Sequence, residues 1–172
     1  MKLTNFTNDR LAVIEIRVLM RMTASAMKVQ APSLRGLSRK SCLQEYQRYT
    51  VSCLENRSGK ELSAMRKAMY NKAFTVGKIL GSLPGLSNDA AKTRLIKLLY
   101  RNIGIRITGS LPGEIRIPRC SFSRFYTPQM CAVMSGMDAG IICGIFGGGT
   151  LTFSERLTEG CPVCRAVYKR KE

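Results

Sequence analysis

The sequence predicts an α+β domain in which helices pack on one face of an antiparallel sheet. Apolar residues recur every three or four positions between residues 41 and 103, which is the period of an amphipathic helix. From Ile103 onward they alternate with polar residues, as in a strand, and a small-residue segment at 129–146 interrupts this second pattern. We therefore expect an N-terminal helical part followed by a C-terminal strand-helix-strand-strand part.

The length of 172 residues is enough for one domain with its own core. Residues 1–40 are expected to form a basic N-terminal arm of uncertain structure that stands apart from the site. Within it, Leu11–Met22 is consistent with a strand or a short helix, and Thr23–Lys40 is polar and basic. Residues 41–172 are expected to form a single α+β domain whose site lies in 118–168.

Three helices are expected in the first half of that domain. A short amphipathic helix follows Ser41, and a longer one covers Lys60–Gly81, where glycine and a Pro-Gly pair stop it. The third begins after Ser87 or Asn88 as N-cap and ends at Gly104. Their methionine and aromatic stripes indicate core packing.

Strand patterns lie on either side of the small-residue segment. Ile103–Ile107 and Ile115–Ile117 alternate around the turn Gly109–Gly113, which predicts a hairpin. Two further strands are expected at Thr150–Leu157 and Val163–Lys169. All four strands can therefore belong to one antiparallel sheet.

The helix expected at 129–146 starts after the Thr127-Pro128 pair, which is typical of a helix N-terminus. It contains Gly136, Gly140 and Gly144, and each interior glycine costs a helix about 1 kcal/mol relative to alanine. Three such glycines indicate that another group packs closely against the backbone of this helix. Tight packing against a sheet and room for a ligand both explain them.

Composition excludes several kinds of chemistry. The chain has no histidine, which rules out Ser-His-Asp and Cys-His catalysis within it and any histidine-ligated zinc site. A general base must then be a carboxylate, a thiolate, a lysine or a metal-bound water. The hydrophobic fraction of 45% and charged fraction of 23% are those of a globular protein and not of a disordered one.

The net charge of +17 makes this a strongly basic protein. Its 28 lysines and arginines are spread along the whole chain, which argues against nucleic acid and favours a small anionic molecule or a solvated face. No apolar run reaches the ~18 residues that a transmembrane helix needs. Glu15 and Arg17 interrupt the first apolar segment, so no signal peptide is expected, and we predict a cytoplasmic protein. The sequence also allows the chain to form a homo-oligomer.

Cys131 and Asp138 are the residues on which the predicted site depends. They are seven positions apart on the expected helix, so they share a face and lie about 10 Å apart along its axis. An acid on an otherwise apolar helix needs a partner if it is buried. Asp138 is therefore either paired with Arg119, Arg124 or Arg156 for structure, or acts as a proton acceptor or a ligand for a substrate amine.

The seven cysteines include a CxxC at Cys161 and Cys164. In a reducing compartment, clustered cysteines more often serve metals or catalysis than disulfides. These two could form half of a zinc site that Cys120 and Cys131 complete, although the separation of the pairs is not that of a standard zinc knuckle. Zinc is therefore left open as a cofactor, with Cys161 and Cys164 as its first candidate ligands.

The site region contains a series of chemically distinctive residues, in chain order Arg119-Cys120, Cys131, Asp138, Glu155-Arg156, Gly160 and Cys164. The series resembles the L-2-amino-thiazoline-4-carboxylic acid hydrolase family. In that family an Arg-Cys leads into a short segment, a second cysteine opens a helix bearing an aspartate, and Gly-x-x-x-Cys ends the domain. The match covers about fifty residues and is scattered.

The same skeleton is also similar to the 4-vinyl-reductase-type sensory domain of aromatic-responsive regulators. In those domains a Cys/Glu cluster binds zinc beneath a hydrophobic ligand pocket. The sequence departs from that pattern, because Arg156 and Leu157 stand where a cysteine usually follows the glutamate. Cys161 fits neither family's pattern.

The first resemblance implies a hydrolase that opens a cyclic amidine carrying a carboxylate. A thiolate would attack the amidine carbon or orient a water, and Asp138 would bind the amidine and transfer a proton. The residues expected to be catalytic are Cys120, Cys131, Asp138 and Cys164. Those expected to bind substrate are Arg119, Ser135, Glu155 and Arg156. The alternative is a non-enzymatic domain that senses a small ligand and has a cysteine-ligated structural zinc.

Overall fold

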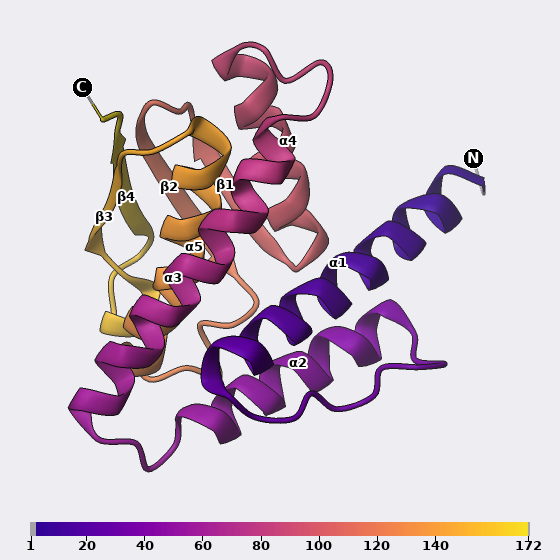
Figure 1. The fold of residues 1–172 in the computed structure, drawn as a ribbon, viewed down its shortest axis with the longest axis vertical. Helices are drawn as coiled ribbons and strands as arrows, with labels where there is room; N and C mark the ends of the chain where they lie inside the picture. Colours follow the sequence, from indigo (N-terminus) through magenta and orange to yellow (C-terminus); the bar gives the residue numbers. More distant parts are fainter. Residues whose placement is uncertain (1–2, 172) are drawn as a thin grey trace.

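The computed structural model describes residues 3–171 and confirms the predicted α+β fold, with helices on one face of an antiparallel sheet (Figure 1). Four helices come first, then two strands, a fifth helix and two more strands. The helices are α1 (Leu3–Met27), α2 (Arg39–Leu54), α3 (Gly59–Gly81), α4 (Asp89–Asn102) and α5 (Pro128–Phe146). The strands are β1 (Ile105–Gly109), β2 (Gly113–Cys120), β3 (Thr150–Glu155) and β4 (Cys164–Lys169), with a 3₁₀ turn at Leu157–Glu159.

The helix boundaries follow from local capping. The hydroxyl of Ser58 and the carboxylate of Glu61 form a capping box at the start of α3. Asn88 caps α4 and Thr127 caps α5, each by accepting a backbone N–H three residues ahead. Gly147 ends α5 in the left-handed conformation with φ of 83°. The predicted starts after Asn88 and Thr127 are therefore confirmed.

The sheet has the strand order β1-β2-β4-β3, and every neighbouring pair is antiparallel. Its buried face includes Ile115, Ala166 and Tyr168, whereas Arg106 and Arg116 are exposed on the other face. Because β4 inserts between β2 and β3, the end of β2 lies beside the start of β4, where Ile117 pairs with Cys164. Two segments more than 40 residues apart thus meet at one end of the two central strands.

The glycines of α5 pack against α3, and not against the sheet or a ligand. A Cβ atom on Gly136, Gly140 or Gly144 would lie 2.4–2.6 Å from a backbone carbonyl oxygen of α3. Gly77 and Gly81 of α3 make the reciprocal approach to α5. Spacing of four residues places the glycines of each helix on one stripe, so the two backbones come into direct contact. Figure 1 shows α3 and α5 running side by side in front of the sheet.

The N-terminal segment differs from the expected arm. Residues 3–27 form one helix of 25 residues, which packs on α2 and α3. Ala12, Ile16 and Met20 are buried at intervals of four, which is the period of a helix. Of the two structures that Leu11–Met22 allowed, a strand or a short helix, the protein forms a helix, and apolar residues also occupy its other faces. Several of them face the site described below.

Helix α5 is the one helix among the described residues that is long and apolar enough to cross a membrane. Most of that segment is buried inside the molecule between α3, the sheet and the site. Its apolar composition is therefore that of a core helix.

Candidate functional site

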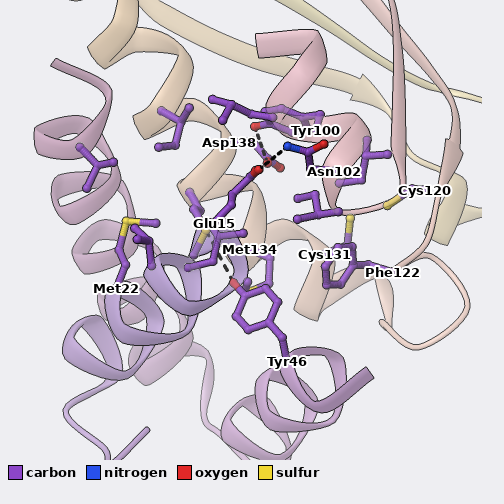
Figure 2. A pocket seen from close by; sticks show the side chains of 18 of the residues that line it. Glu15, Met22, Tyr46, Tyr100, Asn102, Cys120, Phe122, Cys131, Met134 and Asp138 are labelled. Carbon is purple, nitrogen blue, oxygen red and sulfur yellow. Dashed lines mark hydrogen bonds between the residues drawn. The ribbon is translucent and has the colours of Figure 1, made fainter. Parts of the chain in front are cut away.

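A cavity of about 420 Å³ lies between α1, α4 and α5 and reaches the ends of β2 and β4 (Figure 2). Most of its lining is leucine, isoleucine, valine, methionine and phenylalanine. Its polar groups include two acids, an amide and three thiols, from Glu15, Asp138, Asn102, Cys120, Cys131 and Cys164. The cavity thus combines an apolar wall with a few polar groups, as ligand sites commonly do.

The chain topology brings three of the predicted cysteines to this cavity. Cys120 ends β2 and Cys164 begins β4. Because these strands pair antiparallel, both cysteines lie at the same end of the sheet. Cys131 lies in the first turn of α5, which follows β2 after a short loop. All three line the cavity together with Asp138, which shares a face of α5 with Cys131, as their spacing predicted.

Asp138 has a tyrosine as its hydrogen-bond partner, and not one of the three arginines that the sequence offered. The Tyr100 hydroxyl donates to Asp138 Oδ1 at 2.7 Å. Burial raises the pKa of Asp138 to about 6, although this hydrogen bond and the nearby Arg156 charge both act to lower it. The carboxyl group is therefore half-ionised near pH 6 and mostly ionised at neutral pH.

Glu15 is a second acid in the cavity, which sequence reasoning did not place in the site. Its Oε2 accepts a hydrogen bond of 3.0 Å from the Asn102 side chain. Burial raises the pKa of Glu15 to about 7, while Asn102 and the charge of Arg39 lower it. The available signal was an acid inside an apolar helical segment, which requires an explanation wherever it occurs.

The three thiols of the cavity are protonated at neutral pH. Burial raises the pKa of Cys120 to about 12, and it also raises the pKa values of Cys131 and Cys164. For Cys131, the nearby Thr158 and Arg156 act in the opposite direction but do not outweigh burial. A protonated thiol is a poor nucleophile and a poor metal ligand.

Arg156 lies outside the lining of the cavity, and its charge acts on Asp138 and Cys131. It is buried, forms an ion pair with Glu159 at 3.5 Å and donates to the Ser135 hydroxyl at 3.4 Å. The guanidinium carbon also lies 4.5 Å from the ring centroid of Phe153, a cation–π contact. Ser135 itself is buried against Arg156, and neither residue lines the cavity.

Three other predicted site residues lie elsewhere. Arg119 is exposed on the sheet opposite Arg106, and Glu155 forms an ion pair with Arg165 at 3.0 Å. Cys161 lies in the loop before β4 and does not line the cavity, although its CxxC partner does. The structure therefore brings together the cysteines and aspartate of the prediction but not its outer basic and acidic groups.

The zinc alternative lacks a preformed site. Across residues 3–171, no three cysteine, aspartate or glutamate side chains are grouped so that they could hold one metal ion. In the Cys164 thiol, the sulfur accepts a hydrogen bond of 3.2 Å from the backbone N–H of Leu157. Its environment is that of a packed thiol at the cavity wall.

Tyrosines complete the wall of the cavity, and the sequence analysis did not place them in the site. Tyr46 Oη shares a hydrogen bond of 3.0 Å with the Thr23 hydroxyl, and Tyr126 Oη shares one of 2.7 Å with Thr50. Like Tyr100, both rings line the cavity. Their partners come from other helices, so no local pattern could identify them.

Comparison with known proteins adds no relative: no protein-family model and no curated protein matches this sequence. The two resemblances drawn from the cysteine and aspartate series therefore stay predictions.

Proposed function

We propose that this protein is a ligand-binding domain that holds an apolar small molecule in the cavity between α1, α4 and α5. This is the sensing-type alternative that the sequence offered, without a requirement for zinc. The observation that carries the proposal is the cavity itself, which has a volume of about 420 Å³ and an almost wholly apolar wall. That volume is within the range of about 300–1,000 Å³ typical of sites for small organic molecules.

The rim of the cavity supports the same function. Leu11, Ile14 and Val18 of α1 line it and remain 57%, 55% and 43% exposed. Leu98 of α4 also lines the cavity and is exposed. Burying such surface is worth about 25 cal/mol per Å². A ligand that covers the rim therefore gains free energy from side chains that the protein leaves in water.

The cavity thiols also favour binding over covalent chemistry. A nucleophilic cysteine needs a depressed pKa, and such cysteines lie beside cations or helix N-termini with access to water. Burial instead raises the pKa values of Cys120, Cys131 and Cys164. Protonated thiols in this setting act as small apolar wall groups.

A fluorescent probe tests the proposal. N-Phenylnaphthylamine is an uncharged aromatic compound whose emission rises when it leaves water, and we expect saturable binding to the wild-type chain. Val18→Trp places a large ring at the rim and should weaken that binding at least about tenfold, since roughly 1.4 kcal/mol of blocked contact is enough. Val29→Trp is the control, because Val29 is also exposed but lies outside the cavity. Equal binding by both variants would refute the proposed site.

Hydrolysis is the second candidate, and one observation favours it. The pKa of Asp138 is raised to about 6, which suits a general base near neutral pH, and this carboxyl shares the cavity with Cys131. The proposed reaction is the ring opening of a cyclic amidine carboxylate by the hydrolase that the sequence resembles. Its proposed substrate is a small anion.

Turnover of 2-amino-thiazoline-4-carboxylate is the direct test of this second candidate. If the protein is such a hydrolase, Asp138→Asn should lower kcat about a hundredfold or more, as loss of a general base does. Cys161→Ser is the matched control, because that thiol lies outside the cavity. Absence of turnover by the wild-type chain would exclude the reaction and leave ligand binding as the function.

A further inference from the structure

Two carboxyl groups from distant parts of the chain face the same apolar cavity. Glu15 comes from the middle of α1 and Asp138 from the middle of α5, and both line the cavity wall. Figure 2 shows them pointing toward the same region, next to Asn102 and Tyr100. Both carboxylates act electrostatically on Tyr100, which is consistent with their sharing one polar end of the cavity.

Each carboxyl is held in place by a neutral donor from α4. Asn102 donates to Glu15 at 3.0 Å and Tyr100 donates to Asp138 at 2.7 Å. Among the side chains that the structure describes, neither acid forms an ion pair with a lysine or arginine. In a chain with 28 basic residues, two cavity acids without an ion pair are conspicuous.

The nearest cations have other partners. Arg39, which influences Glu15, forms an ion pair with Asp9 and donates to the carbonyl oxygen of Asn102. Arg156, which influences Asp138, forms an ion pair with Glu159 and stacks on Phe153 outside the cavity lining. Among the side chains that the structure describes, the charged groups that line the cavity are those of Glu15 and Asp138.

We propose that the ligand of this cavity is a hydrophobic cation, an apolar body with one protonated amine or amidine that is bound between Glu15 and Asp138. The proposal rests on the proposed function, since it names the chemical class of the molecule that the cavity holds. The nitrogen lies at the carboxyl end, and the body covers apolar side chains of α1, α4 and α5. A buried charge is stable only when paired, and such a cation pairs with both acids.

This chemistry distinguishes the cation from its alternatives. A carboxylate or phosphate at the same end would face two acids, which would have to stay protonated to tolerate it. A neutral hydrocarbon would leave both polar groups against its surface without a new partner, at a cost in binding free energy. The cation alone gains from ionisation of both acids.

The pH dependence of binding follows from the groups that face these acids. Around Glu15 they are Asn102 and Tyr100 of α4 and Arg39 of α2. Around Asp138 they are Tyr100, Arg156, Tyr46, Tyr126, Cys120, Cys131 and Cys164. In the empty cavity the pKa values of Glu15 and Asp138 are raised to about 7 and 6, so a bound cation should displace protons in that range.

The experiment compares three compounds with one apolar body: phenylbutylamine, phenylbutanol and phenylbutyrate. Each is titrated into the full-length protein by calorimetry at pH 8, where we expect the amine to bind about tenfold more tightly than the alcohol, the factor for one pKa unit of charge pairing. The butyrate should bind more weakly than both. At pH 6.5, amine binding should release protons into the buffer, whereas alcohol binding should not.

Two conservative variants localise the effect. Glu15→Gln and Asp138→Asn should each reduce the preference for amine over alcohol and reduce the proton release, with little change in alcohol affinity. Thermal unfolding of each variant confirms that it is folded, and the comparison of compounds on the wild type does not depend on the variants. Glu55→Gln, an exposed glutamate outside the cavity, is the control.

The outcomes separate this inference from the proposed function. If phenylbutanol and N-phenylnaphthylamine bind and Val18→Trp blocks them, but the amine has no advantage, the cavity binds ligands and the cation inference is wrong. A tighter complex with the butyrate would overturn it in favour of an anion. If none of the compounds binds, the proposed function fails as well.

Discussion

The two faces of α5 differ in what they contact: one packs against α3 and the other lines the cavity. On one face Gly136, Gly140 and Gly144 bring its backbone against that of α3. On the other face Met134, Asp138 and Ile141 line the cavity. On the first face the glycines allow the two helix backbones to touch. On the second face large side chains and an acid surround a cavity.

This difference explains why small residues were a poor guide to a ligand site. A stripe of glycines on a helix allows close approach, and a neighbouring helix fills the room that it provides. Here α3 does so over most of its length, with Gly77 and Gly81 facing back. The space for a ligand instead lies between α1, α4 and α5, beside methionines that can adjust to different shapes.

The largest expected effect comes from adding one methyl group to the packed face. In Gly140→Ala the new Cβ would lie 2.4 Å from the carbonyl oxygen of Tyr70 and 2.7 Å from the Cβ of Ala73. Such overpacking should lower the free energy of unfolding by about 3 kcal/mol, more than the gain of about 1 kcal/mol in helix propensity. Urea unfolding measures the difference.

Gly59→Ala is the matched control for that substitution. Gly59 begins α3, and nothing lies within 4 Å of a Cβ added there. We expect its unfolding midpoint to equal that of the wild type or to exceed it slightly. If Gly140→Ala behaves in the same way, the contrast between the two faces of α5 does not hold.

A smaller effect is expected from the cavity, and it should depend on pH. The pKa of Glu15 is raised from 4.5 to about 7, so the folded chain binds this proton more tightly than the unfolded chain does. The stability that this proton contributes is fully present below about pH 4.5 and is lost as the pH rises through about 7. Relative to Glu15→Gln, the wild type should therefore lose on the order of 2–3 kcal/mol between pH 4.5 and 8.

Denaturant unfolding of both proteins over this pH range provides the measurement. Glu55→Gln should show a constant difference from the wild type, because Glu55 is exposed. A constant difference for Glu15→Gln as well would mean that Glu15 is solvated, and that the cavity does not separate it from water.

The smallest expected effect concerns the hydrogen bond between α4 and α5. Tyr100→Phe removes the donor of the 2.7 Å bond to Asp138, which should lower the free energy of unfolding by about 1 kcal/mol. Because that bond holds down the pKa of Asp138, the substitution should move this pKa above about 6. NMR titration of the carboxyl carbon reports the shift. Tyr70→Phe, which changes a ring outside the cavity, should leave the pKa of Asp138 unchanged.

Much of the fold could be predicted from local signals. The change from a helical to an alternating period near Ile103 predicted where the sheet begins, and Asn88 and Thr127 predicted two helix starts. The placement of Cys131 and Asp138 on one helix face also followed from spacing alone. These features depend on residues close in sequence, whose geometry the backbone determines.

The missed parts of the site involve contacts between distant segments. Glu15 was read only as an obstacle to a signal peptide, because its role depends on α1 lying beside α4. Tyr100 was not identified as a site residue, because its bond to Asp138 spans 38 positions. Arg156 was expected to hold substrate, but its partners Glu159, Ser135 and Phe153 keep it behind the wall.

The sequence by itself thus determined the order of the helices and strands after residue 40, the exclusion of histidine chemistry and the face of α5 that carries Cys131 and Asp138. Tertiary structure decided what each face of that helix meets. The insertion of β4 beside β2 brought Cys164 to Cys120, and the packing of α3 on the glycines left the other face open to α1 and α4. The physical reason is that periodicity reports which residues share a face, whereas long-range packing alone selects the partner of that face.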